Sequence, residues 1–136
     1  MLYPLHFVLA APKGYEPNEE ILRQAMKQGV STIEIIEDPN AAVKKADVLY
    51  TDVWTSMGQE AESEKRKRDF AGYQVNARLL AQAKPDCVVM HCLPAHRGEE
   101  ITNDVIEGSQ SIVFDEAENR LHVQKAVMAK LLESVD

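Results

Sequence analysis

A thiol, two imidazoles and a guanidinium lie within the eight-residue stretch Met90-His91-Cys92-Leu93-Pro94-Ala95-His96-Arg97. The stretch directly follows a strand-like run, Cys87-Val88-Val89, and its proline ends that strand. In open α/β sheets, ligands bind at the carboxyl ends of the strands. A cysteine there can act as a nucleophile, a metal ligand or a polarisable wall beside a substrate amine. We therefore expect a functional site at this turn.

The same stretch offers zinc ligands in His91, Cys92 and His96. A structural zinc site takes four ligands, usually as closely spaced pairs, and Cys87 is expected to point elsewhere. Side chains alternate faces along a strand, so the odd spacing of Cys87 and Cys92 also disfavours a disulfide. We expect no metal, no other cofactor, reduced cysteines in a cytoplasmic protein, and a hydrogen-bonded core position for His91.

A second polar group follows another strand-like run, at residues 48–51. Asp52 could supply charge to a substrate ammonium group, and Ser56 a hydrogen-bond acceptor. Trp54, the only tryptophan of the chain, could shield such a site from water. For Asp52 or Trp54 taken alone, a structural role is the simpler interpretation: Asp52 would cap the next turn and Trp54 would fill the core.

Arg120 stands near the start of the last expected helix, where a guanidinium can bind an oxyanion or a phosphate. The alternative is an ion pair with Glu116, one helical turn away. The only dense basic run, residues 65–68, is interleaved with acids and predicts a solvated helix face. Together with the net charge of −7, it argues against a nucleic-acid or anionic-membrane partner. No apolar run approaches the ~18 residues of a membrane span.

The elements that must position these residues alternate along the chain. We expect strands at residues 5–11, 32–36, 48–51, 87–91 and 111–114, and helices at 19–28, 39–46, 61–71, 76–83, 104–107 and 116–133. Asn18 and Asp38 are expected N-caps, with Pro39 at a first helical position and Gly29 ending the first helix. This order predicts an α/β protein with a parallel sheet, as a single domain over residues 1–136.

Three motifs resemble, in order and spacing, those of the ornithine carbamoyltransferases. They are Asp52-x-Trp54-x-Ser56-Met57-Gly58, His91-Cys92-Leu93-Pro94 and Glu116-Ala117-Glu118-Asn119-Arg120. Residues 12–17 and 73–75 also resemble that family, and the resemblance covers about residues 5–132. The Ser-Met-Gly loop together with the His-Cys-Leu-Pro turn separates this group from the aspartate enzymes of the same superfamily.

The resemblance implies transfer of a carbamoyl group from carbamoyl phosphate to the δ-amine of ornithine, which gives citrulline and phosphate. Asp52, Ser56 and Met57 would bind the amino-acid end of ornithine. Cys92 would lie beside the reacting amine as a positioning and proton-handling residue, without being acylated.

The remaining implied roles concern the carbamoyl group. The Leu93 carbonyl would accept a hydrogen bond from the carbamoyl nitrogen, and Arg120 would stabilise the negative charge that grows on the carbamoyl oxygen. Cys92 and Arg120 are therefore the expected catalytic residues, and proximity of the two substrates would supply the other large effect.

The resemblance also implies a three-layer, Rossmann-like sheet with helices on both faces, of which this chain lacks parts. The sequence contains neither the Ser-x-Arg-Thr-Arg loop nor the His-Pro-x-Gln motif of the family's amino-terminal carbamoyl-phosphate domain, so we expect the chain alone to be inactive. The family's first, central strand should precede Leu5. We expect a rearranged sheet or one that another chain completes in a homo-oligomer.

Two alternatives stay open. The chain could be a non-catalytic amino-acid-binding or protein-interaction module derived from a carbamoyltransferase, although the survival of Asp52, Ser56, Cys92 and Arg120 favours an enzyme fragment. A relative that acts on another amine, such as putrescine, is disfavoured because the Ser-Met-Gly loop suits an α-amino acid.

Overall fold

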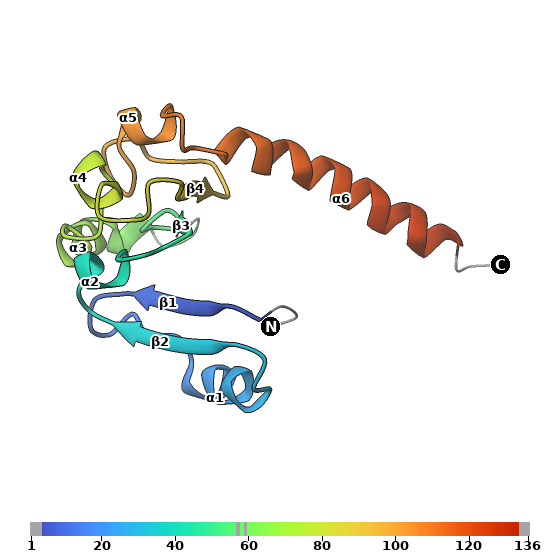
Figure 1. The fold of residues 1–136 in the computed structure, drawn as a ribbon, viewed down its shortest axis with the longest axis horizontal. Coiled ribbons are helices and arrows are strands. Elements are labelled where there is room, and N and C mark those ends of the chain that lie inside the picture. The colour runs from blue at the N-terminus through green and yellow to red at the C-terminus, as the bar shows by residue number, and fades with distance from the viewer. Residues whose placement is uncertain (1–3, 57, 59, 134–136) are drawn as a thin grey trace.

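Strands and helices alternate along the chain (Figure 1). The computed structural model describes residues 4–56, 58 and 60–133. For Glu60 it describes the backbone and not the side chain. The strands are β1 (His6–Ala10), β2 (Thr32–Ile36), β3 (Val48–Thr51) and β4 (Val88–His91). The helices are α1 (Glu19–Lys27), α2 (Pro39–Ala42), α3 (Ser63–Asp69), α4 (Ala77–Leu80), α5 (Asn103–Ile106) and α6 (Val113–Glu133), and a short 3-10 helix, η1 (Glu60–Glu62), precedes α3.

Local capping signals set where the first two helices begin. The Asn18 side chain accepts hydrogen bonds from the backbone N–H groups of Glu20 and Ile21, and Asp38 accepts one from Asn40. Pro39 is the first residue of α2. A backbone N–H at that position has no hydrogen-bond acceptor within the helix, so proline, which lacks the N–H, is tolerated there. Gly29 follows α1 with a φ of +66°, in the left-handed region that glycine tolerates. The predicted caps are thus confirmed.

The strands form two parallel pairs. β1 pairs with β2, with His6 opposite Thr32, and β3 pairs with β4, with Thr51 opposite His91. Within the described residues these are two separate two-stranded sheets, so β1 and β3 each have one strand neighbour. The α/β class with parallel strands is confirmed. The register of the second sheet places the carboxyl ends of β3 and β4, and the residues that follow them, side by side.

The predicted fifth strand at residues 111–114 is wrong. Only Ser111 makes a bridge, to Val89, and α6 begins at Val113. The Ile112 N–H still donates to the Val89 carbonyl, but the Ile112 carbonyl already accepts from Glu116 N–H inside the helix. Asp115 and Glu116 in the first turn also favour a helix start, because carboxylates interact well with its free N–H groups. The chain therefore enters α6 at Val113, three residues before the helix start expected at residue 116.

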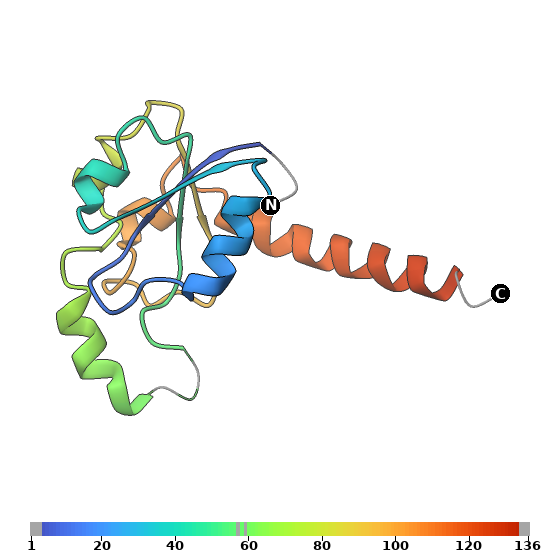
Figure 2. The same ribbon diagram turned by 90° about the horizontal axis from the view of Figure 1, so that it is seen from below.

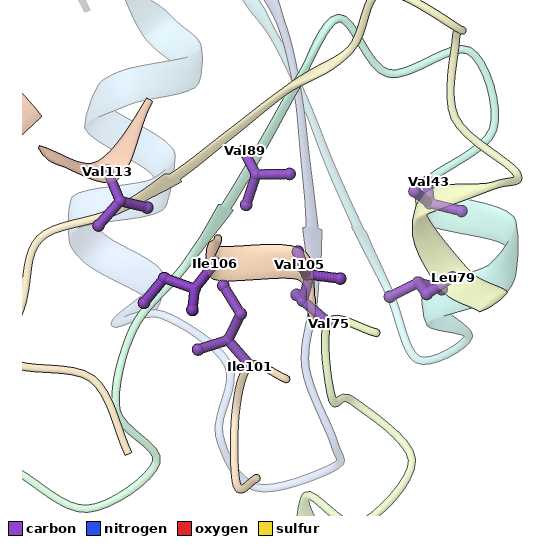
Figure 3. Close-up of a cluster of buried hydrophobic side chains, with 8 residues drawn as sticks. All are labelled: Val43, Val75, Leu79, Val89, Ile101, Val105, Ile106 and Val113. Atoms are coloured by element: carbon purple, nitrogen blue, oxygen red, sulfur yellow. The ribbon is translucent and has the colours of Figure 1, made fainter. Parts of the chain in front are cut away.

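The core lies beside β4 (Figure 3). It joins side chains from β4, α4, α5 and the start of α6 with three residues outside the helices and strands, of which Val43 directly follows α2: Val43, Val75, Leu79, Val89, Ile101, Val105, Ile106 and Val113. By contrast, no residue of β1 or β2 is fully buried. The buried core therefore lies in the part of the molecule that carries the carboxyl end of β4.

Helix α6 extends away from the rest of the molecule (Figures 1 and 2). Val113 is its one buried residue among those described. Apolar side chains farther along it are half exposed or more, including Leu121, Met128 and Leu131. Only the first turns of α6 are therefore held by the core. No helix within the described residues combines the length and apolarity that a membrane crossing needs.

Candidate functional site

The carboxyl ends of β3 and β4 bring two of the predicted site residues into direct contact. Since Thr51 lies opposite His91, the next residue of each strand, Asp52 and Cys92, falls at the same edge of the sheet. The Cys92 thiol donates a hydrogen bond to Asp52 Oδ1 over 3.1 Å. The same oxygen accepts from the Val53 N–H at 2.7 Å. The acid thus turns toward the thiol and also anchors the start of its own loop.

Arg120 reaches this edge from α6. Its Nη1 donates to the backbone carbonyl of Cys92 over 2.9 Å. The alternative interpretation, an ion pair with Glu116, is not what the structure shows, because both Glu116 oxygens accept other hydrogen bonds. Glu116 Oε1 accepts from the Tyr50 hydroxyl and Oε2 from the His91 N–H, each at 3.1 Å. Glu116 thus joins β3, β4 and α6, and this leaves the Arg120 guanidinium at the Cys92 turn.

The turn after β4 has an unusual backbone. Leu93 has a φ of +52°, in the left-handed region that side chains disfavour, and the Leu93–Pro94 peptide bond is cis. The Leu93 N–H points back and donates to His91 Nδ1 over 2.9 Å. His91 is fully buried and hydrogen-bonded, which confirms the core position expected for it. Cys92 and Leu93 are thereby held at the surface of the turn, partly exposed to solvent.

Electrostatics at the site favour a protonated thiol. Burial raises the pKa of Cys92, and the hydrogen bond to Asp52 and the charge of that carboxylate raise this pKa further. The pKa of Tyr50 is also raised, first by partial burial of its hydroxyl and then by the hydrogen bond of that hydroxyl to Glu116. The Tyr50 side chain as a whole is half exposed. Because a thiolate is the reactive form of cysteine, this environment supports a positioning role and does not favour a nucleophile.

The loop after β3 is held by an aromatic cluster of Tyr15, Trp54, Phe70 and Tyr73. Trp54 stacks on Phe70 with ring centroids 6.0 Å apart, and Phe70 meets Tyr15 and Tyr73 edge to face. Arg66 of α3 also donates to the Trp54 carbonyl. Trp54 is half-buried, so it neither fills the main core nor lies free over the site.

Of the two remaining predicted site residues, Ser56 is exposed. No hydrogen bond joins it to Asp52, Cys92 or Arg120, all of which the structure describes. Met57 lies outside the described residues. The structure therefore brings together Asp52, Cys92 and Arg120 without Ser56.

The zinc triad of His91, Cys92 and His96 does not assemble. Two other groups of ligand atoms lie within 4.8 Å of one another among the described residues: Asp52 with His91 and Cys92, and His96 with Glu99 and Glu100. In the first group both ring nitrogens of His91 already have hydrogen-bond partners, Leu93 and Glu100. A metal would have to displace one of them, so the donor set does not fit a metal centre.

Sequence reasoning missed Tyr50, Glu100 and the bridging role of Glu116. A tyrosine at the end of a strand and an acid in the first turn of a helix are ordinary choices, and only the packing of α6 against β4 brings them together. One signal was available for Glu100: it lies nine residues after a histidine expected in the core, and a buried histidine needs a partner.

Comparisons with known proteins identify relatives of this chain. Residues 1–131 match the family model of the aspartate/ornithine carbamoyltransferases, Asp/Orn binding domain. The ornithine carbamoyltransferase of Chlorobaculum tepidum is 60% identical over 131 residues, 96% of this chain and 39% of that protein. That of Archaeoglobus fulgidus is 59% identical over 128 residues, 94% of this chain and 41% of that protein. The chain thus spans about two fifths of the length of these relatives.

Solved structures agree. The ornithine carbamoyltransferase from Pyrococcus furiosus superposes with a TM-score of 0.82 at 46% identity, covering 93% of this chain and 49% of that one. The anabolic ornithine carbamoyltransferase from Campylobacter jejuni gives a TM-score of 0.88 at 36% identity, covering 95% of this chain and 44% of that one. The likeness holds in sequence and in fold, over nearly the whole chain.

Proposed function

Since the chain belongs to the aspartate/ornithine carbamoyltransferase family, whose Asp/Orn-binding domain it matches, we propose that it is the ornithine-binding domain of an ornithine carbamoyltransferase. The observation that carries the proposal is the convergence of Asp52, Cys92 and Arg120 at one sheet edge, from three elements far apart in sequence. These are three of the positions at which the motifs resemble that family. One domain is proposed for residues 1–136.

In the proposed reaction the δ-amine of ornithine attacks the carbonyl carbon of carbamoyl phosphate. A new C–N bond forms, the C–O bond to phosphate breaks, and the amine loses a proton, which gives citrulline and phosphate. Asp52, with Ser56 and Met57 from the same loop, binds the amino-acid end of ornithine. The Cys92 thiol, protonated and held by Asp52, lies beside the δ-amine and orients it.

Arg120 and the Leu93 carbonyl act on the carbamoyl group. Arg120 already donates to the Cys92 carbonyl, so its guanidinium lies where a carbamoyl oxygen would approach the turn. There it stabilises the negative charge that develops as the amine attacks. The Leu93 carbonyl accepts a hydrogen bond from the carbamoyl nitrogen. Both groups act by preorganisation, because they occupy their places before the substrate arrives.

The isolated chain is proposed to bind ornithine without turning it over. The sequence has neither the Ser-x-Arg-Thr-Arg phosphate loop nor the His-Pro-x-Gln motif of the family's carbamoyl-phosphate domain. The cysteines are free thiols, which supports the cytoplasmic location expected from the sequence. Ornithine and carbamoyl phosphate are the two proposed substrates of the complete enzyme.

The two sheets also support a proposal on assembly: a second copy of the chain completes the sheet with a parallel strand between β1 and β3. Each of these strands has one strand neighbour among the described residues, and an unpaired strand edge is a site for pairing. Apolar side chains on them are partly exposed, among them Phe7 (40%) and Val48 (51%). Sedimentation should find a homo-oligomer, whereas a monomer whose β1 and β3 amides resist hydrogen exchange would contradict this proposal.

Calorimetric titration of ornithine, and of norvaline with carbamoyl phosphate, into the purified chain tests the function. We expect binding that Asp52→Ala and Cys92→Ala weaken. Asp86→Ala is the matched control, because Asp86 is an exposed acid that precedes β4 at the opposite end of the strand. Equal binding by all four chains would contradict the assigned site. No heat from a cooperatively folded chain would contradict ornithine binding, and turnover of both substrates at a normal enzymatic rate would contradict the proposed dependence on a second domain.

A further inference from the structure

His91 and Glu100 are fully buried, and they are the two polar residues in the core of the described chain. Neither one touches a substrate in the reaction proposed above. Burying an ionisable pair is costly, and replacing it with apolar side chains often costs no stability. Glu100 Oε2 is moreover buried without a hydrogen-bond partner among the described residues. The pair is therefore a poor device for stability alone, and its geometry points to another use.

The hydrogen bonds around His91 define its tautomer. Nδ1 accepts from the Leu93 N–H at 2.9 Å, so it carries no proton, and the ring proton lies on Nε2. Nε2 then donates to Glu100 Oε1 over 3.1 Å. Glu100 thereby selects the tautomer whose other nitrogen can hold Leu93. This arrangement resembles the way in which a second residue orients a histidine at catalytic sites.

Glu100 holds the far side of the same turn. Its Oε1 accepts a second hydrogen bond, from the His96 N–H at 2.6 Å. One carboxylate oxygen thus connects to Leu93 through His91 and to His96 directly. Leu93, between these two attachment points, adopts the left-handed φ of +52°. A leucine keeps that conformation only where its surroundings impose it.

We infer that His91 and Glu100 are positioning residues, which fix the backbone at Leu93 and thereby keep the Cys92 thiol toward Asp52 and the Leu93 carbonyl in one orientation. The inference rests on the proposed function for what the turn presents, a thiol and a carbonyl to the two substrates. The hydrogen-bonded turn itself can be tested without any ligand.

Four substitutions in the 136-residue chain separate the two halves of the pair. His91→Asn keeps an acceptor near the position of Nδ1 and loses the donor to Glu100, whereas His91→Gln keeps a donor near Nε2 and loses the acceptor for Leu93. Glu100→Gln keeps an acceptor oxygen, and Glu100→Leu removes it. Amide hydrogen exchange at Leu93 and His96 is the readout. The Val89 amide, bonded to the Gln110 carbonyl within the core, reports on global stability.

We expect exchange at Leu93 to rise about tenfold in His91→Gln, as for the loss of one net hydrogen bond, and much less in His91→Asn. Glu100→Leu should speed exchange about tenfold at both Leu93 and His96, and Glu100→Gln should restore most of the protection. Exchange at Val89 should change less than at either site. If Leu93 and Val89 change equally in every variant, or if Leu93 is unaffected by His91→Gln, the pair is merely structural and the inference fails.

Norvaline titration of the same variants distinguishes this inference from the proposed function. If the unmodified chain binds no norvaline, the proposed function fails. The exchange rates at Leu93 and His96 still test whether His91 and Glu100 fix the turn. If the unmodified chain binds norvaline and His91→Gln binds it equally despite a loosened Leu93, the turn does not present the substrate-binding groups and the positioning role is wrong. Weaker binding by His91→Gln than by His91→Asn supports it.

Discussion

The Cys92 thiol donates to Asp52 Oδ1 over 3.1 Å, although the two residues lie 40 positions apart in the sequence. Parallel pairing of β3 with β4 produces this contact, since Thr51 lies opposite His91 and each site residue comes next. The contact joins a residue proposed to bind the amino-acid end of ornithine to one proposed to orient its reacting amine. It also makes the protonation of Cys92 sensitive to Asp52.

Asp52→Asn should lower the pKa of Cys92. Burial raises this pKa first, and the hydrogen bond and charge of Asp52 raise it further, so a neutral amide removes only the second part. The rate of Cys92 alkylation by iodoacetamide, followed against pH, should therefore show its midpoint at a lower pH in the variant. Peptide mapping separates Cys92 from Cys87, which is fully buried.

Asp86→Asn is the control for that measurement, because Asp86 is exposed and precedes β4. Its midpoint should match that of the unmodified chain. A midpoint that is unchanged in Asp52→Asn, or one that moves to higher pH, would show that the thiol does not sense this carboxylate.

Glu116→Ala should lower the free energy of unfolding by about 1–3 kcal/mol, because it leaves the His91 N–H and the Tyr50 hydroxyl without their acceptor. Urea denaturation measures the change. Glu118→Ala is the matched control, since Glu118 lies in the same helix with a side chain 73% exposed, and it should stay within about 0.5 kcal/mol. Equal losses in the two variants would mean that Glu116 does not connect α6 to the strands.

Gly108→Ala should destabilise the chain although Gly108 has an ordinary φ. A Cβ built there meets the Asp104 carbonyl oxygen at 2.9 Å and the Val105 carbonyl oxygen at 3.2 Å, and backbone atoms cannot move aside cheaply. We expect a loss of about 1–3 kcal/mol in urea denaturation, the range for overpacking. A Cβ at Gly72 meets nothing within 4 Å, so Gly72→Ala should be neutral or slightly stabilising. The reverse order would contradict the packing at the end of α5.

Phe70→Leu should shift the fluorescence emission of Trp54 to longer wavelength, because it removes the ring on which the indole stacks and admits water. Trp54 is the only tryptophan, so the signal needs no assignment. Phe114→Leu, which changes a 56% exposed ring on α6 outside the aromatic cluster, should leave the emission unchanged. If both variants shift the emission alike, the cluster does not hold the loop that carries Ser56.

Features that depend on neighbouring residues were predictable from the sequence. The strands at Thr32–Ile36 and Val48–Thr51 have their expected bounds, and Asn18 and Asp38 cap the helices they were expected to cap. Each cap is a hydrogen bond to a backbone N–H two or three residues away, so the local sequence contains both partners. The motif resemblance was equally a property of the sequence, and the family match confirms it.

Features that depend on distant partners were not predictable in the same way. In place of the strand expected at residues 111–114, the chain begins α6, whose Glu116 accepts hydrogen bonds from the Tyr50 hydroxyl and the His91 N–H. No local sequence pattern contains those partners. The alternative interpretation of Arg120, an ion pair with Glu116, failed for the same reason. The sequence by itself determined the helix caps, the parallel α/β class and the residue types of the site. The tertiary structure decided which of them meet, because strand register and the packing of α6 against β4 set those distances.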